Sequence, residues 1–174
     1  MTAVTAITVT CPPAVTSCLR LNSMAIEDFK KEHFNADFRD RPFPFVESVS
    51  APQRLYFRNG LAFGLGMPQD AEPLDILRRL QESLEAPPSY DATDSSFDLE
   101  LVARDLNLGP INDVYINWDR FDHVDRMHFG DLAKYFKYVW YSVSDDIEIF
   151  DQTLRWVIVI RHDGALSFVP LLRR

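Results

Sequence analysis

The sequence predicts an α+β domain in which a mainly antiparallel sheet carries helices packed on one side and ends in a C-terminal β-meander. Three observations support this prediction. Residues 140–169 contain three short strand-like runs separated by turn residues. Within them, 154–160 is a mostly apolar run typical of a central strand. After Pro73, leucine and isoleucine recur at helical spacing. Strands and helices in these proportions predict a layered α+β domain.

The N-terminal half is expected to hold strands, a hairpin and two helices. Prolines at 12 and 13 separate two alternating stretches. Asn59-Gly60 favours a tight hairpin, because both residues tolerate positive φ. Pro73 suits a first helical position. The expected elements are strands at 3–10 and 14–22, a helix at about 25–34 with Ile26, Phe29 and Phe34 inward, strands at 53–57 and 61–65, and a helix that buries Leu74, Ile76, Leu77, Leu80 and Leu84.

In the C-terminal half, helices and strands alternate before the meander begins. Gly130 and Asp131 introduce a helix, and Asp163-Gly164 is a second hairpin signal. The expected order is a helix at 97–106, a strand at 114–118, a charged loop at 119–128, a helix carrying Leu132, Tyr135, Phe136 and Val139, and strands around 147–149, 154–160 and 165–169.

Length and composition predict one domain, residues 1–174, with a hydrophobic fraction of 47%. No run approaches the 18 apolar residues that indicate a membrane span, and the N-terminus lacks the basic start of a secretory signal. Two cysteines are too few for a disulfide framework, so a reducing cytoplasm is the simplest compartment.

The net charge of −8 is concentrated in one segment. Residues 91–151 hold 14 Asp/Glu against 5 Lys/Arg, a net of −9, and the remaining residues hold 12 acidic and 13 basic side chains, a net of +1. Such a field repels nucleic acid and attracts a basic protein partner. The same charge is also compatible with a solvated surface that keeps the protein soluble.

Two acidic groups invite a metal or catalytic interpretation. Asp119, Asp122, His123, Asp125 and His128 crowd one stretch, but their spacing matches no known ligand pattern. Asp145, Asp146 and Glu148 resemble the acidic pair of a metal-dependent nuclease but lack a nearby lysine. Asp146 and Glu148 alternate with isoleucines, which favours an outward acidic strand face. The expectation is no metal, no cofactor and no catalysis. A metal-dependent hydrolase using residues of 119–128 or 145–148 is the alternative.

Aromatic side chains accompany this acidic segment and suit a protein interface. Tyrosine and tryptophan beside carboxylates can hold basic side chains of a partner, whereas nucleic-acid stacking would need a positive groove. The candidate partner-binding residues are Asp119, Asp122, Asp125, Asp145, Asp146, Glu148, Trp118 and Tyr141.

The runs FGDLAKYF at 129–136, WYSVSDDIEIFD at 140–151, LRWV at 154–157 and HDG at 162–164 resemble the C-terminal part of small bacterial immunity proteins. Members of these families are cytoplasmic antidotes of polymorphic and contact-dependent toxin systems. The resemblance covers about the last 50 residues and carries no catalytic signature. It implies a protein that binds and blocks a cognate toxin with a basic surface, often a nuclease, without chemistry of its own.

Overall fold

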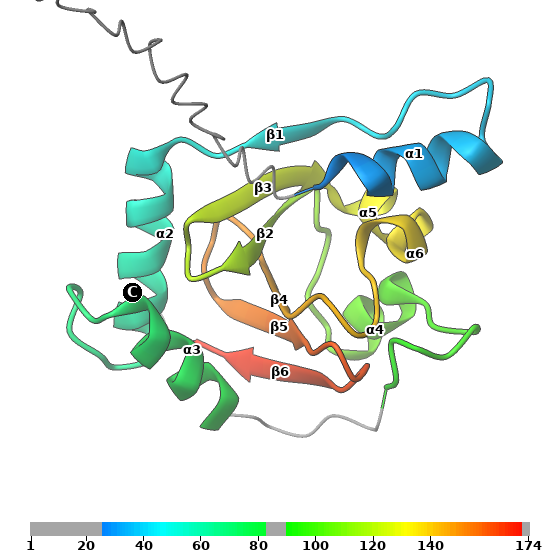
Figure 1. Cartoon of the computed structure of the whole chain (residues 1–174). Coiled ribbons are helices and arrows are strands. Elements are labelled where there is room, and N and C mark those ends of the chain that lie inside the picture. The colour runs from blue at the N-terminus through cyan, green and yellow to red at the C-terminus, as the bar shows by residue number, and fades with distance from the viewer. Residues whose placement is uncertain (1–25, 83–89, 172–174) are drawn as a thin grey trace, which may run out of the picture.

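A six-stranded antiparallel sheet forms the centre of the protein in a computed structural model, which describes residues 26–82 and 90–171 (Figure 1). The expected strands at 3–10 and 14–22, and the expected burial of Leu84, lie outside these ranges. The strand order is β1-β3-β2-β4-β5-β6, with bounds β1 Val46–Ser48, β2 Asp113–Asp119, β3 His123–His128, β4 Ile147–Phe150, β5 Trp156–Ile160 and β6 Leu166–Pro170.

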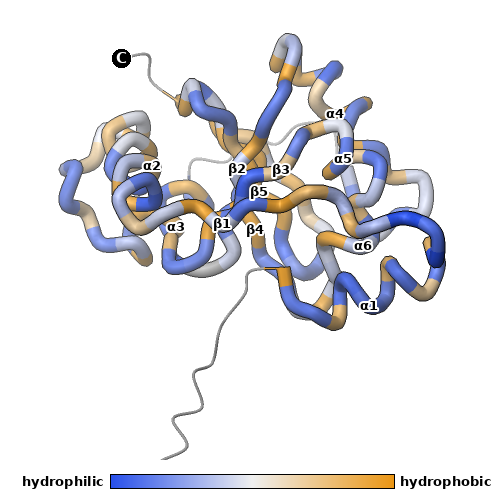
Figure 2. Tube along the Cα trace, turned by 90° about the horizontal axis from the view of Figure 1, so that it is seen from above, coloured by the Kyte–Doolittle hydropathy of each residue, from blue (hydrophilic) through white to orange (hydrophobic). Residues whose placement is uncertain are grey.

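Helices cover both faces of this sheet. The bounds are α1 Asp28–Asp37, α2 Ala51–Gly64, α3 Pro73–Glu82, α4 Leu99–Asp105, α5 Phe129–Lys134 and α6 Phe136–Val139. One apolar core joins α4, α5 and α6 to the sheet, and a second core joins α2 and α3 to the opposite face. Seen from above, the two groups of helices lie on either side of the strands (Figure 2).

The α+β class, the antiparallel sheet and the C-terminal meander are confirmed, and the helices expected on one side occupy both. The residues of β5 explain this difference. Trp156, Ile158 and Ile160 face one core, while Val157 and Val159 face the other. Since neighbouring side chains of a strand point to opposite faces, an uninterrupted apolar run needs a cover on each face.

The meander follows the expected turn chemistry. After β4, the Asp151 carboxylate accepts hydrogen bonds from the backbone N–H and the hydroxyl of Thr153. After β5, Gly164 adopts a φ of 87° at the turn into β6. A Cβ at Gly164 would collide with the side chains of Asp91 and Thr93, so this turn requires glycine for both its backbone angle and its space.

The expected hairpin at 53–57 and 61–65 is wrong, because α2 is continuous from Ala51 to Gly64. Gln53 Oε1 accepts hydrogen bonds from the backbone N–H and hydroxyl of Ser50 at the start of the helix. Phe57 and Leu61 share one face and are buried. The helical spacing of these apolar residues prevailed over the local hairpin preference of Asn59-Gly60.

The expected charged loop at 119–128 is also wrong, because β3 begins at His123. Only the tip of the hairpin, residues 120–122, separates β2 from β3. Arg120 and Phe121 there have φ angles of 44° and 64°. Charged residues enter the strand because they have partners: Arg126 forms an ion pair with Glu47 on β1 at 2.6 Å.

Helix α1 begins three residues later than expected and turns a different side chain inward. Phe29 is 45% exposed, whereas Lys30 is 1% exposed. Lys30 and Phe34 are four residues apart, which places them on one face of α1. The expected helices at 73 and 97–106 are confirmed by α3 and α4. The expected burial of Leu74 is wrong, because this first-turn side chain is 48% exposed while Ile76 and Leu80 face the core. In the described ranges, no helix has the length and apolar character to cross a membrane.

Candidate functional site

The end of the sheet where β2 finishes and β4 begins brings most of the candidate partner-binding residues together. Trp118 lies near the end of β2, and Asp145 and Asp146 come directly before β4. Strands β2 and β4 are paired, with Asn117 opposite Glu148. Trp118 takes part in two arrangements, one internal and one open to solvent.

The internal arrangement, here called the lysine network, consists of Lys30, Trp118, Asp125, Tyr141 and Asp145. Lys30 Nζ lies 2.6 Å from Asp145 Oδ2 and 4.3 Å from the centre of the Trp118 ring. The same Asp145 oxygen accepts a hydrogen bond from the Tyr141 backbone N–H at 2.8 Å. Trp118 Nε1 donates to Asp125 Oδ2 at 3.2 Å. These contacts connect α1 to the strands and the loop before β4.

Burial decides the properties of this network. Asp125 is 2% exposed, and its desolvation raises the pKa of its carboxyl although Ser48 Oγ and Trp118 Nε1 donate hydrogen bonds to it. Burial likewise raises the pKa of the Tyr141 hydroxyl, which contacts His33. The side chain of Asp145 is 13% exposed. These residues are occupied by internal partners.

The open arrangement is a cavity of about 350 Å³, here called the acidic pocket. Asp146, Glu148 and Ser144 line it from β4 and the loop before it, Trp118 and Arg120 from β2 and the hairpin tip, and Leu77 and Gln81 from α3. It therefore gathers two carboxylates, one guanidinium and one aromatic ring.

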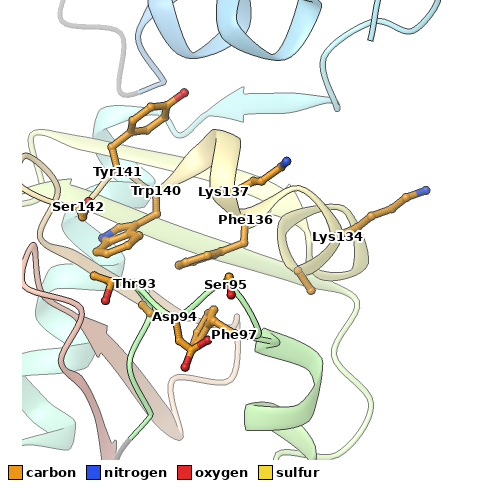
Figure 3. A pocket seen from close by; sticks show the side chains of 12 residues that line it. Thr93, Asp94, Ser95, Phe97, Lys134, Phe136, Lys137, Trp140, Tyr141 and Ser142 are labelled. Carbon is orange, nitrogen blue, oxygen red and sulfur yellow. The ribbon is translucent and has the colours of Figure 1, made fainter. Parts of the chain in front are cut away.

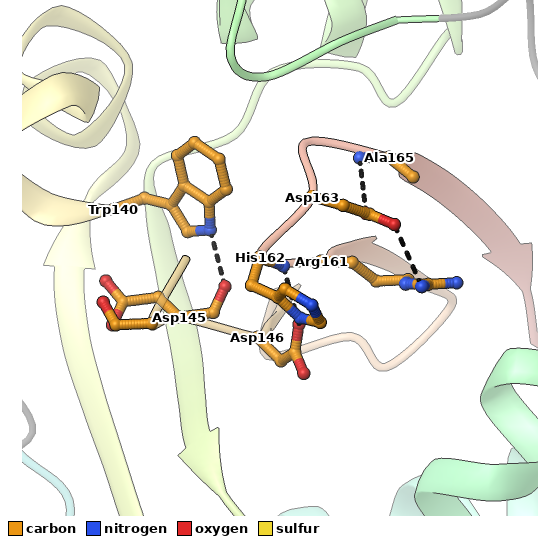
Figure 4. A network of polar contacts seen from close by, with 8 residues as sticks. Trp140, Asp145, Asp146, Arg161, His162, Asp163 and Ala165 are labelled. Carbon is orange, nitrogen blue, oxygen red and sulfur yellow. Dashed lines mark hydrogen bonds and ion pairs between the residues drawn. The ribbon is translucent and has the colours of Figure 1, made fainter. Parts of the chain in front are cut away.

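The two carboxylates of the acidic pocket differ in exposure. Asp146 is exposed, and its Oδ1 accepts hydrogen bonds from the backbone N–H and the ring Nδ1 of His162 at 2.7 and 2.8 Å (Figure 4). Glu148 is 7% exposed, and Asn117 Nδ2 donates to its Oε2 at 2.5 Å. The expected outward acidic strand face is therefore wrong at Glu148, since this side chain points toward the core shared with α2 and α3.

The remaining candidates are spread around this end of the sheet. Asp122 is exposed at the hairpin tip and lies beside arginine side chains of α2, and Asp119 is the last residue of β2. Tyr141 also lies at the rim of a different, open cavity of about 540 Å³ (Figure 3). There, Phe97, Phe136 and Trp140 pack against one another, and the ammonium groups of Lys134 and Lys137 lie over Tyr135 and Tyr138.

The described side chains of Asp122, His123, Asp125 and His128 do not gather as metal ligands. Because they belong to a hairpin, neighbours such as Val124 and Asp125 face opposite sides of the sheet. Among the residues that the structure describes, no group of three or more His, Cys, Asp or Glu side chains is placed to hold a metal ion.

Two residues that organise this region escaped the sequence interpretation. Lys30 is one, and its position four residues before the buried Phe34 was the available signal. Asn117 is the other: it is fully buried, donates to Glu148, and accepts a hydrogen bond from the Phe121 N–H at 2.9 Å. An asparagine between Ile116 and Trp118 in a strand pattern indicated a buried polar contact.

Comparisons with known proteins found no matching family model, no matching curated protein and no matching solved structure.

Proposed function

We propose that this protein is a non-catalytic immunity or inhibitor protein that binds a basic surface of a cognate bacterial toxin. The observation that carries the proposal is the acidic pocket, which joins Asp146 and Glu148 to Trp118 in the segment that holds all the excess negative charge. Carboxylates beside an aromatic ring form a receptor for an arginine or lysine side chain.

The chemistry of Trp118 supports a cationic occupant. Its ring already accepts an internal ammonium group, Lys30 Nζ, at 4.3 Å. A partner's cation entering the acidic pocket would meet the same residue together with two carboxylates. Arg120 contributes one positive charge to the lining, so the carboxylates still outnumber the cations.

The candidate residues have separate roles in this proposal. Asp146 is exposed and provides the direct contact, with Glu148 deeper in the pocket. The exposed Asp122 and the partly exposed Tyr141 lie outside the acidic pocket and would add contacts at the same end of the sheet. Asp119 remains a candidate as the last residue of β2. Asp125 and Asp145 hold Trp118 and the loop before β4 in place through the lysine network. For a nuclease toxin, these carboxylates would occupy positions that substrate phosphates otherwise take.

The test uses the product of a toxin gene adjacent to the gene for this protein, purified in an inactive form. Titration calorimetry measures its binding to the unmodified protein and to Asp146→Lys. We expect charge reversal at Asp146 to weaken binding about tenfold or more, because it places like charges at the contact. The affinity should also fall as ionic strength rises.

Glu100→Lys is the matched control. Glu100 lies exposed on α4 within the same acidic segment, so this variant changes net charge equally without touching the acidic pocket. Equal weakening by both variants would remove the pocket from the proposal. If no adjacent gene encodes a toxin, or if its product does not bind, the proposed function is wrong.

A further inference from the structure

We propose that a second cavity, of about 180 Å³, binds a phosphate-like oxyanion. It lies where the first half of α2 and the start of α3 meet the β2–β3 hairpin tip. The side chains that matter are Arg54 and Arg58 of α2 and Arg120 and Asp122 of the hairpin. This cavity is here called the arginine pocket. It shares Arg120 with the acidic pocket, but the inference does not rest on the proposed toxin binding.

The charge of the arginine pocket is opposite to that of the whole protein. Three guanidinium groups and one carboxylate line it, in a chain with a net charge of −8. Arg54 and Arg58 are four residues apart on α2, so they are neighbours on one helix face, where like charges repel. A bound anion would remove that repulsion, and guanidinium forks match the geometry of phosphate oxygens.

Arg58 supplies an independent observation. Its Nε is buried, and nothing in the described ranges accepts a hydrogen bond from it. Buried donors are nearly always paired in folded proteins. Arg58 also lines the arginine pocket, so an oxyanion held there would neutralise the charge of a guanidinium whose Nε has no acceptor. Arg54, by contrast, already donates from Nη1 to the Val49 carbonyl oxygen at 2.8 Å, which fixes its side chain beside the cavity.

The hairpin tip is held in an unusual conformation beside this pocket. Arg120 and Phe121 both have positive φ angles. Glycine or asparagine normally adopts this backbone conformation in tight hairpins. The burial of Phe121 and its N–H hydrogen bond to Asn117 Oδ1 maintain this backbone. Strain of this kind is concentrated at functional sites. Here it places Arg120 and Asp122 at the cavity.

The surroundings also favour an anion of small size. Pro73, the first residue of α3, lines the cavity, so the positive end of that helix dipole is close to it. Ala51, the first residue of α2, lines it as well. The volume suits a single phosphate or phosphate monoester group better than a larger ligand.

Inorganic phosphate is the probe. We expect the ¹⁵N-edited NMR signal of Arg58 Nε to shift saturably with phosphate in the millimolar range at constant ionic strength. Acetate should shift it less, because a carboxylate offers fewer oxygens to three guanidinium groups. A signal that responds no more to phosphate than to chloride at matched ionic strength overturns the inference.

Variants localise the effect. Arg58→Met keeps the apolar stem and removes the guanidinium, so the variant should fold, and phosphate should no longer raise its melting temperature. Arg58→Lys retains the charge without the planar fork and should bind phosphate more weakly. Arg78→Met is the control, since Arg78 is exposed on α3 and pairs with Asp75. Full phosphate stabilisation in Arg58→Met would also overturn the inference.

Discussion

The lysine network and the acidic pocket share Trp118, and their carboxylates belong to the same acidic segment. The carboxylates of the two arrangements differ in their exposure to solvent. In the lysine network, Asp125 is buried, the side chain of Asp145 is only 13% exposed, and both carboxylates have internal donors. In the acidic pocket, Asp146 remains exposed at the edge of an open cavity. Residues 145 and 146 are neighbours in the chain, but only Asp146 is exposed to solvent.

This difference shows that a local excess of charge is not the same as a charged surface. A buried carboxylate contributes to stability or to the alignment of its neighbours, and an exposed one contributes to association. The comparison predicts that variants of the lysine network change stability and that variants at Asp146 change binding.

The largest expected effect follows the loss of Lys30. Lys30→Met leaves the largely buried Asp145 carboxylate without its cation and beside an apolar side chain, which should lower the free energy of unfolding by about 3 kcal/mol. Urea denaturation measures this value. Lys31→Met is the control, because Lys31 pairs with Asp28 at the surface at 3.6 Å and should cost less than about 1 kcal/mol. Similar losses in both variants would contradict the internal role of Lys30.

Asn117 tests the polar contact beneath the acidic pocket. Asn117→Ala removes the donor to Glu148 and the acceptor of the Phe121 N–H, leaving two buried groups without partners. We expect a loss of about 2 kcal/mol in the free energy of unfolding. Asn112→Ala, at an exposed position, should change it by less than about 0.5 kcal/mol. A near-neutral Asn117→Ala would show that neighbouring groups compensate.

A smaller effect should appear as a pH dependence at Asp125. Desolvation raises the pKa of this carboxyl in the folded protein. The protonated carboxyl therefore contributes its full stabilisation below the pKa of the unfolded chain, about 3.9. This contribution is lost as the pH rises through the pKa of the folded protein. The unmodified protein should therefore lose stability relative to Asp125→Asn as the pH rises from about 4 toward neutrality. Denaturation midpoints at a series of pH values measure this difference.

Asp91→Asn should change the pH dependence of stability in the opposite direction. Hydrogen bonds from Thr93 lower the pKa of the Asp91 carboxyl. Its contribution is present above the unfolded pKa and is lost as the pH falls through the folded pKa. If Asp125→Asn and Asp91→Asn give pH profiles of the same sign, the burial argument for Asp125 is wrong.

The smallest effect on stability is expected at Asp146. Asp146→Asn retains an oxygen that can accept from the His162 backbone N–H, so the free energy of unfolding should change by less than about 0.5 kcal/mol. Thermal and urea denaturation measure it beside the binding experiment. A large loss of stability would place Asp146 with the internal carboxylates and remove the contrast between the two arrangements.

The periodicity of the sequence was sufficient to predict several helices, strands and turns, and insufficient to predict others. The apolar run of β5, the turns at Asp151 and Gly164, and the burial of Ile76 and Leu80 in α3 were predictable, because local spacing and turn residues specify them. Helix α2 was not, since Asn59-Gly60 is a strong hairpin signal until the burial of Phe57 and Leu61 is known. Strand β3 was missed because its charged residues have partners on other strands.

The sequence alone determined the fold class, the C-terminal meander and the segment that holds the excess of acidic residues. Tertiary structure decided which of those acids are buried, because burial depends on residues far away in the chain. Asp145 became internal through Lys30, 115 positions distant, and Glu148 through Asn117, 31 positions distant. No local pattern encodes such pairings, since they arise only when the helices close over the sheet.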